Sequence, residues 1–135
     1  MISAATGSKA DVTLAKVIDP GKPTSPYGGV PAGDRYVGLD VKIVGVSTKA
    51  LFPAADARIN VTVTGSNGHT YKSVTALALY EGDLVGCKNL TDGKLAAGAG
   101  QTISGCIIFA LARAVKIATA VYSETAGTRA QWQVT

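Results

Sequence analysis

The sequence predicts an all-β protein, an antiparallel β-sandwich with about seven to eight strands in two sheets. Apolar and polar residues alternate in several short stretches, which is typical of strands with one buried face. Turns rich in Gly, Pro and Asn separate these stretches, and no long helical period occurs. The 135 residues are 47% hydrophobic and 16% charged, which is enough apolar material for the core of a small domain.

A chain of this length is expected to form one domain. We expect residues 1–10 to be a flexible N-terminal lead-in and residues 11–135 to form a single β-sandwich domain. The first strand is predicted over residues 11–19, where apolar and polar residues alternate. The alternation slips at Val17, which indicates a β-bulge.

The segment from Pro20 to Gly33 is predicted to be a long loop. It holds four of the five prolines, and proline has no N–H to donate within a helix or a central strand. Loops of about fourteen residues are uncommon in compact domains and are often functional. Tyr27, Gly28 and Gly29 lie in its middle and form the candidate interaction loop.

The clearest strand is predicted at residues 36–43, whose apolar side chains all fall on one face. Pro53 limits any helix after this strand to a single turn. Alternation or an apolar run predicts the remaining strands, at residues 58–64, 69–74, 101–111, 115–122 and 128–134. Residues 75–90 are predicted to be extended or irregular.

Two side chains have expected places in these strands. Ile59 is expected to point into the core from the strand at residues 58–64, as every second residue does. Trp132, the only tryptophan, is expected to fill the core, where burial would contribute about 2–3 kcal/mol.

Cys87 and Cys106 are the only cysteines. A pair of thiols in a small domain rich in turns favours a disulfide and an oxidising compartment. Alternation places Cys106 on the opposite face from Ile107 and Phe109. If those two face the core, the bridge lies on the outer face of the sheet and fastens the segment of residues 79–90 to it.

The residues provide no catalytic, cofactor or metal site. Two cysteines and one histidine fall short of the four ligands of a structural zinc site. His69 follows a predicted hairpin turn, where a side chain is usually exposed, and no Gly-x-Ser-x-Gly motif accompanies it. The pair Glu81 and Asp83 is far short of a calcium site. We therefore expect no enzyme, no cofactor and no bound metal.

The charge pattern argues against nucleic acid as a partner, whereas the compartment has to be inferred from other features of the sequence. The net charge is +4, but the 13 basic residues are scattered, so we expect no binding to nucleic acid. No apolar run is long enough to span a membrane. The residues after Met1 do not form a secretory signal. The protein is therefore either cytoplasmic or a mature chain whose signal peptide has been removed, and the cysteines favour the second.

Three stretches carry a resemblance to a known family. They are the strand Tyr36–Val41, the hairpin end Gly68-x-x-Tyr71 and the run Gln101–Phe109 after a Gly-rich loop. This pattern resembles the immunoglobulin-like domains of unknown function in secreted proteins and lipoproteins of actinobacteria and other Gram-positive bacteria. The small secreted immunogenic proteins of mycobacteria belong to that group. The resemblance extends from about Asp11 to Val134.

The resemblance implies an immunoglobulin-like sandwich outside the cell membrane, with either a soluble form or a lipid anchor added to the precursor. It provides no catalytic residues. Ala96–Gly100 replaces the proline that usually precedes the Gln101 strand, so the chain departs from the family pattern there.

These observations lead to one expected function and two alternatives. We expect a secreted or surface-anchored, non-catalytic module that binds an unknown protein or a component of the envelope or of a host surface. The first alternative is a small-ligand carrier or an enzyme with a pocket near the Pro20–Gly33 loop. The second is a structural accessory domain of an envelope complex.

Overall fold

The computed structural model describes residues 1–4, 7–25, 29–30, 32–48, 50–74, 82–90, 95–124 and 127–134. The expected loop residues Tyr27 and Gly28 and the acidic residue Glu81 lie outside these ranges. The described residues form one helix, α1 (Ala54–Asn60), and ten strands: β1 (Ile2–Ser3), β2 (Lys9–Gly21), β3 (Asp34–Gly45), β4 (Phe52–Pro53), β5 (Val61–Gly65), β6 (Thr70–Lys72), β7 (Ala96–Ala97), β8 (Thr102–Ala112), β9 (Ile117–Ser123) and β10 (Arg129–Gln133).

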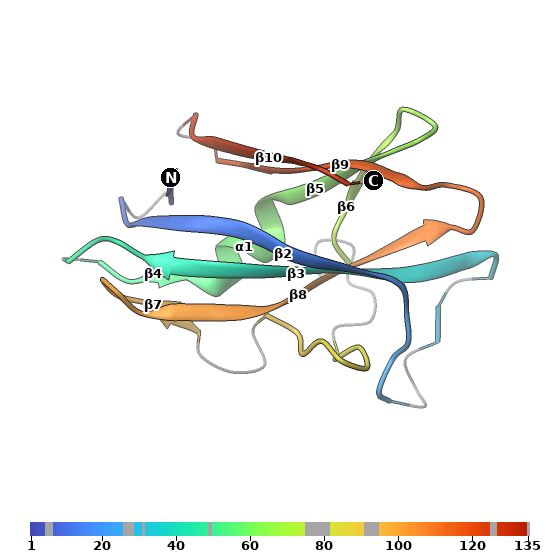
Figure 1. The fold of residues 1–135 in the computed structure, drawn as a ribbon, viewed down its shortest axis with the longest axis horizontal. Coiled ribbons are helices and arrows are strands. Elements are labelled where there is room, and N and C mark those ends of the chain that lie inside the picture. The colour runs from blue at the N-terminus through green and yellow to red at the C-terminus, as the bar shows by residue number, and fades with distance from the viewer. Residues whose placement is uncertain are drawn as a thin grey trace.

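Two antiparallel sheets of four strands form the body of the molecule. One has the order β1-β2-β3-β8 and the other the order β10-β9-β5-β6, and the small pair β4-β7 lies beside them. Figure 1 shows β2, β3 and β8 in one layer and β5, β9 and β10 in another. Side chains from both sheets share one buried core, which confirms an all-β fold with antiparallel sheets.

The predicted alternation of β3 builds the inner face of the first sheet. Val37, Leu39, Val41 and Ile43 are fully buried. In the register of β3 and β8, Leu39 lies opposite Ile107 and Val37 lies opposite Phe109. These residues therefore face the core, as the sequence predicts. The predicted bulge in β2 is also present, as a register shift between Leu14 and Lys16.

A second, smaller core covers the outer face of the same sheet. It contains Tyr36 and Ile108 from the sheet and Leu84 from the segment of residues 82–90. The disulfide between Cys87 and Cys106 fastens this segment, with the two Cα atoms 5.6 Å apart. The sequence predicts both the bond and its position on the outer face, and both predictions are confirmed.

The same segment follows the free edge of β8. The Leu90 N–H donates to the Cys106 carbonyl at 2.9 Å, and the Cys106 N–H donates to the Lys88 carbonyl at 2.6 Å. Gly105 allows this close approach, because a Cβ there would lie 2.7 Å from the Leu90 Cα. The segment therefore covers both the outer face and part of the edge of β8.

The strand count differs from the seven or eight that the sequence predicts. The structure has ten strands in its described part, and three of them, β1, β4 and β7, have only two residues each. Two residues are too few to show a period of two, so alternation does not reveal such strands. They are defined by their partners, as when Phe52 pairs with Ala97.

The prediction of a strand from residue 58, with Ile59 facing inward, is wrong. Residues 54–60 form α1, which begins directly after Pro53 and buries Ala54 and Ala57. Ile59 is 59% exposed. Helical spacing of the two alanines defines the buried face, whereas Ile59 merely extends the alternation of the strand that follows.

Residues 1–10 and Trp132 both contribute to the packing of the sheets. Residues 1–10, expected to be a flexible lead-in, contain β1 and the first two residues of β2, and Ile2 and Ala4 are buried. Trp132 is half-buried and packs against the main core from β10. The one described helix is too short to cross a membrane.

Candidate functional site

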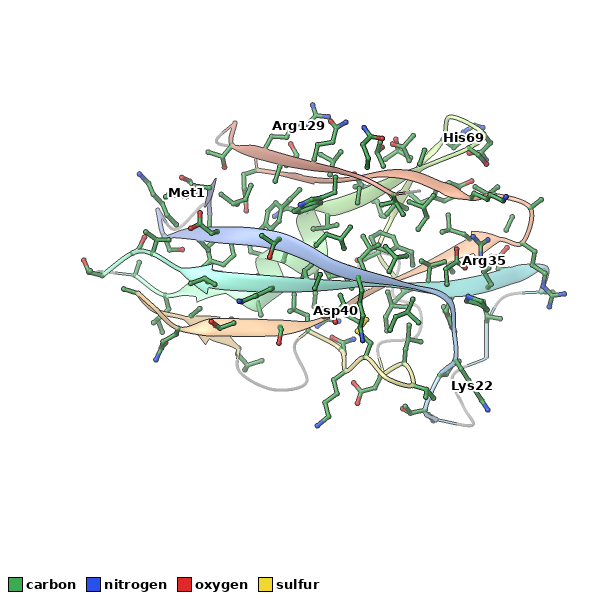
Figure 2. The ribbon with its side chains drawn as sticks, viewed as in Figure 1. Met1, Lys22, Arg35, Asp40, His69 and Arg129 are labelled. Atoms are coloured by element: carbon green, nitrogen blue, oxygen red, sulfur yellow. A yellow bond between two sulfur atoms is a disulfide. The ribbon has the colours of Figure 1, made fainter. Side chains whose placement is uncertain are left out.

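Arg35 holds three strands together at one end of the molecule. It lies near the start of β3, where its Nε and Nη2 donate to the two carboxylate oxygens of Asp19 at 2.6 and 3.0 Å. Its Nη1 donates to the Ala112 carbonyl of β8 at 2.7 Å. The hydrogen bond to Asp19 raises the pKa of Arg35 above its ordinary value. Figure 2 shows Arg35 at the end of the molecule far from Met1.

Two cavities adjoin at Arg35. The larger, of about 760 Å³, opens between the two sheets, and the smaller, of about 520 Å³, lies beside the segment of residues 20–36. Arg35 and Arg113 line both. The smaller cavity has mostly apolar walls, formed by Pro20, Gly21, Pro23, Gly29, Val30, Asp34, Arg35, Tyr36 and Arg113. The larger is lined by Val17, Asp19, Arg35, Arg113, Lys116, Ile117, Gln133 and Val134.

The described part of the predicted Pro20–Gly33 loop forms a wall of the smaller cavity. The buried Tyr36 donates its hydroxyl hydrogen to the Gly29 carbonyl at 3.0 Å. At the other end of the segment, the Val85 N–H donates to the Lys22 carbonyl at 2.7 Å. The wall is therefore tied both to β3 and to the segment that carries the disulfide.

Arg113 and Lys116 supply positive charge to the cavities. Both follow the end of β8 and both are exposed. Arg35 and Asp19 form the only ion pair among the described residues. Neither Arg113 nor Lys116 is therefore paired with a described carboxylate. An anionic group entering either cavity would meet a guanidinium that no described carboxylate neutralises.

A second polar cluster lies between α1 and β9. The Tyr122 hydroxyl donates to Asp56 Oδ2 at 2.7 Å. Glu124, which is 6% exposed, lies close enough to both residues to interact with them electrostatically. Its Oε1 has no hydrogen-bond partner among the described residues. The cluster thus places a buried carboxyl group and a buried phenol beside the half-buried carboxyl group of Asp56.

Burial dominates the acid–base behaviour of this cluster. Loss of hydration, followed by the neighbouring Asp56, raises the pKa of Glu124 from 4.5 to about 7. Loss of hydration and Asp56 also raise the pKa of Tyr122 far above its ordinary value, so the phenol stays protonated. Neither of the two cavities described above is lined by Asp56, Tyr122 or Glu124.

The other residues considered from the sequence do not assemble into a site. His69 is exposed, just before β6, and Figure 2 shows it away from Arg35. Asp83 Oδ1 accepts a hydrogen bond from the Asn89 N–H at 2.8 Å, so it closes the turn that carries Cys87. The described residues contain no group of three or more His, Cys, Asp or Glu side chains that could hold a metal.

Sequence reasoning missed the residues that the structure brings together. Arg35, Arg113 and Lys116 are among the 13 basic residues, which are scattered along the sequence and form no cluster there. The position of Glu124 could have been predicted from the sequence. Ala120, Tyr122 and Glu124 are alternate residues, so they share the inward face of β9 and its extension.

The chain matches no known family model, no characterised protein and no solved structure.

Proposed function

We propose that the protein is a non-catalytic binding module with an immunoglobulin-like sandwich, and that it takes its ligand at the end of the molecule where the two cavities meet. The observation that carries this proposal is the pair of adjoining cavities beside Arg113, one of them lined by the segment near the predicted interaction loop. Gly29, the described member of that loop, lines the smaller cavity.

The proposed compartment is the cell envelope or the exterior. The disulfide between Cys87 and Cys106 is compatible with an oxidising environment. The resemblance to secreted and lipid-anchored immunoglobulin-like domains supports the same assignment. In this proposal the module is either soluble or anchored through a lipid on the precursor.

The cavity walls favour a ligand with an apolar body and an anionic group. Pro20, Pro23 and Val30 offer apolar surface, and Arg113 offers a charge at the rim. A guanidinium binds carboxylates, sulfonates and phosphates through paired hydrogen bonds, which fixes the orientation of such a group. Arg35 is already engaged by Asp19, so it shapes the wall while Arg113 receives the anion.

The experiment uses anilinonaphthalene sulfonate, which combines an apolar ring system with an anion and fluoresces when it leaves water. We expect it to bind the folded protein and to shift the backbone amide resonances of Val30 and Arg113. Arg113→Gln should weaken binding about tenfold, which is typical for loss of one charge-assisted contact.

Arg129→Gln is the matched control, because Arg129 is an exposed arginine on β10 that lines neither cavity. It should leave binding of the probe unchanged. Equal binding by wild type and Arg113→Gln, or resonance shifts confined to other parts of the molecule, would contradict the proposed site.

A further inference from the structure

The strand edges of the two large sheets are protected to different degrees. In the described part of the chain, segment 88–90 runs along the edge of β8, and β6 has only three residues. The edge of β2 beyond Ala10 is interrupted by two register shifts and by Pro20, devices that discourage pairing with another chain. As far as the structure describes the chain, the outer edge of β10 carries none of these protections.

The edge of β10 is regular and its backbone groups are available. Five consecutive residues pair with β9 without a register shift. The Val134 N–H donates to the Ala118 carbonyl at 2.8 Å and therefore points toward β9. Because successive residues of a strand point in opposite directions, the N–H and C=O groups of Gln131 and Gln133 point toward the open edge.

Apolar surface is left partly uncovered on the same side of the molecule. Six partly buried apolar residues pack against the edge of the main core, and five of them come from β2, from β10 or directly after β10: Leu14, Val17, Ala130, Trp132 and Val134. The sixth, Tyr71, lies on β6. At one end β1 closes the side between β2 and β10, because the Ser3 N–H donates to the Thr128 hydroxyl just before β10 at 2.9 Å. Farther along, the described residues place no strand or helix between β2 and β10.

The charge at one end of this side is positive. The cavity of about 760 Å³ lies there, between Val17 of β2 and Val134 beyond β10. Asp19 is its one carboxylate lining residue and is engaged by Arg35. Arg113 and Lys116 are left as cations without a carboxylate partner among the described residues.

From these four observations we infer that the edge of β10 is a docking site for an extended, acidic segment of a partner protein. The segment adds to the sheet as a strand next to β10, which is a recurring mode of peptide recognition. Its apolar side chains cover Trp132 and Val17, and its acidic end meets Arg113 and Lys116. This surface shares Arg113 and the larger cavity with the proposed small-ligand site, but strand pairing along β10 does not require that site to bind a small ligand.

The probe is a synthetic seven-residue peptide with valine at alternate positions, threonine between them and two glutamates at one end. We expect it to change the fluorescence of Trp132 and to shift the amide resonances of Gln131 and Gln133. A peptide with lysine in place of both glutamates should bind about tenfold more weakly, because Arg113 and Lys116 then repel it.

Gln131→Pro removes an outward N–H from β10 without removing a hydrogen bond to β9, since proline is tolerated where the N–H faces away from the neighbouring strand. It should weaken binding of the peptide at least about tenfold. Gln131→Thr keeps the N–H and should bind as the wild type does. Circular dichroism and the thermal midpoint verify that both variants are folded.

A second measurement leaves the protein unchanged. Methylating the peptide nitrogens that face β10 should abolish binding to the wild-type protein, whatever Gln131→Pro does to folding. Equal binding of methylated and unmethylated peptides would overturn the inference, as would absence of binding. A dimer of the protein that Gln131→Pro dissociates would also overturn it, since a second copy would then occupy the edge. Loss of sulfonate binding in Arg113→Gln with peptide pairing at β10 retained would separate this surface from the small-ligand site.

Discussion

Replacing Glu124 by glutamine should stabilise the protein at neutral and alkaline pH and have little effect in acid. In the folded protein the pKa of Glu124 is raised from its ordinary 4.5 to about 7, mainly by burial and then by Asp56. The folded state therefore keeps a proton that the unfolded chain releases between these two values. Stability contributed by the protonated form is present below about pH 4.5 and is lost as the pH rises to about 7.

The size of the change in stability follows from the shift in the pKa of Glu124. A rise from 4.5 to about 7 corresponds to about 3 kcal/mol of stability lost between acid and neutral pH, as an upper figure. Glutamine is neutral at every pH and has nearly the same shape. Glu124→Gln should therefore approach the wild type in stability near pH 4 and exceed it by up to about 3 kcal/mol near pH 8.

Urea unfolding followed by the fluorescence of Trp132 measures these stabilities at a series of pH values. Asp11→Asn is the control for a lost negative charge, since Asp11 is exposed on β2. The difference between Glu124→Gln and wild type must grow with pH, whereas that for Asp11→Asn must stay nearly constant. A difference for Glu124→Gln that is independent of pH would refute the assignment of a raised pKa to this carboxyl group.

Three further changes, one of them with a matched control, test other contacts. Reducing the disulfide between Cys87 and Cys106 should lower the free energy of unfolding by about 3 kcal/mol, as urea titrations with and without dithiothreitol would measure, because the bond closes a loop of about twenty residues. Gly105→Ala should cost about 1–3 kcal/mol, since an added Cβ would lie 2.7 Å from backbone on the adjoining segment. Thermal melts measure this cost, and Gly29→Ala is the control: nothing lies within 4 Å of the added Cβ, so the substitution should be neutral. Tyr122→Phe should lower the free energy of unfolding by about 1 kcal/mol, because it removes the hydrogen bond that the Tyr122 hydroxyl donates to Asp56. Calorimetry measures the change, and an unchanged melting point would contradict a stabilising role for this hydrogen bond.

The features that sequence predicted well are those that local alternation determines. The inward face of β3 follows from the period of two, and the same period places Cys106 opposite to Phe109. Two cysteines leave a single intramolecular pairing, so the disulfide needed no further information. The helix α1 was missed because Ile59 continues the alternation of β5 by coincidence, while the short Ala54–Asn60 segment has too few residues to show a helical period.

The candidate site depends on register, which alternation does not specify. Arg35 reaches Asp19 and the Ala112 carbonyl because β3 pairs with β2 on one side and with β8 on the other at a particular offset. Alternation excludes a slip by one residue, which would turn the apolar face outward, but a shift by two residues keeps the pattern and would separate the three groups. The open edge of β10 likewise depends on the order of strands in the sheet.

The small core on the outer face of the first sheet has a consequence for producing the protein. Tyr36 and Ile108 are covered there by the segment that the disulfide fastens. Synthesis in a reducing cytosol would leave the thiols unbridged, and a detached segment would expose these side chains as an apolar strip, which promotes aggregation. Export to the bacterial periplasm, or refolding with oxidised glutathione, should therefore give a higher yield of monodisperse protein than cytosolic expression.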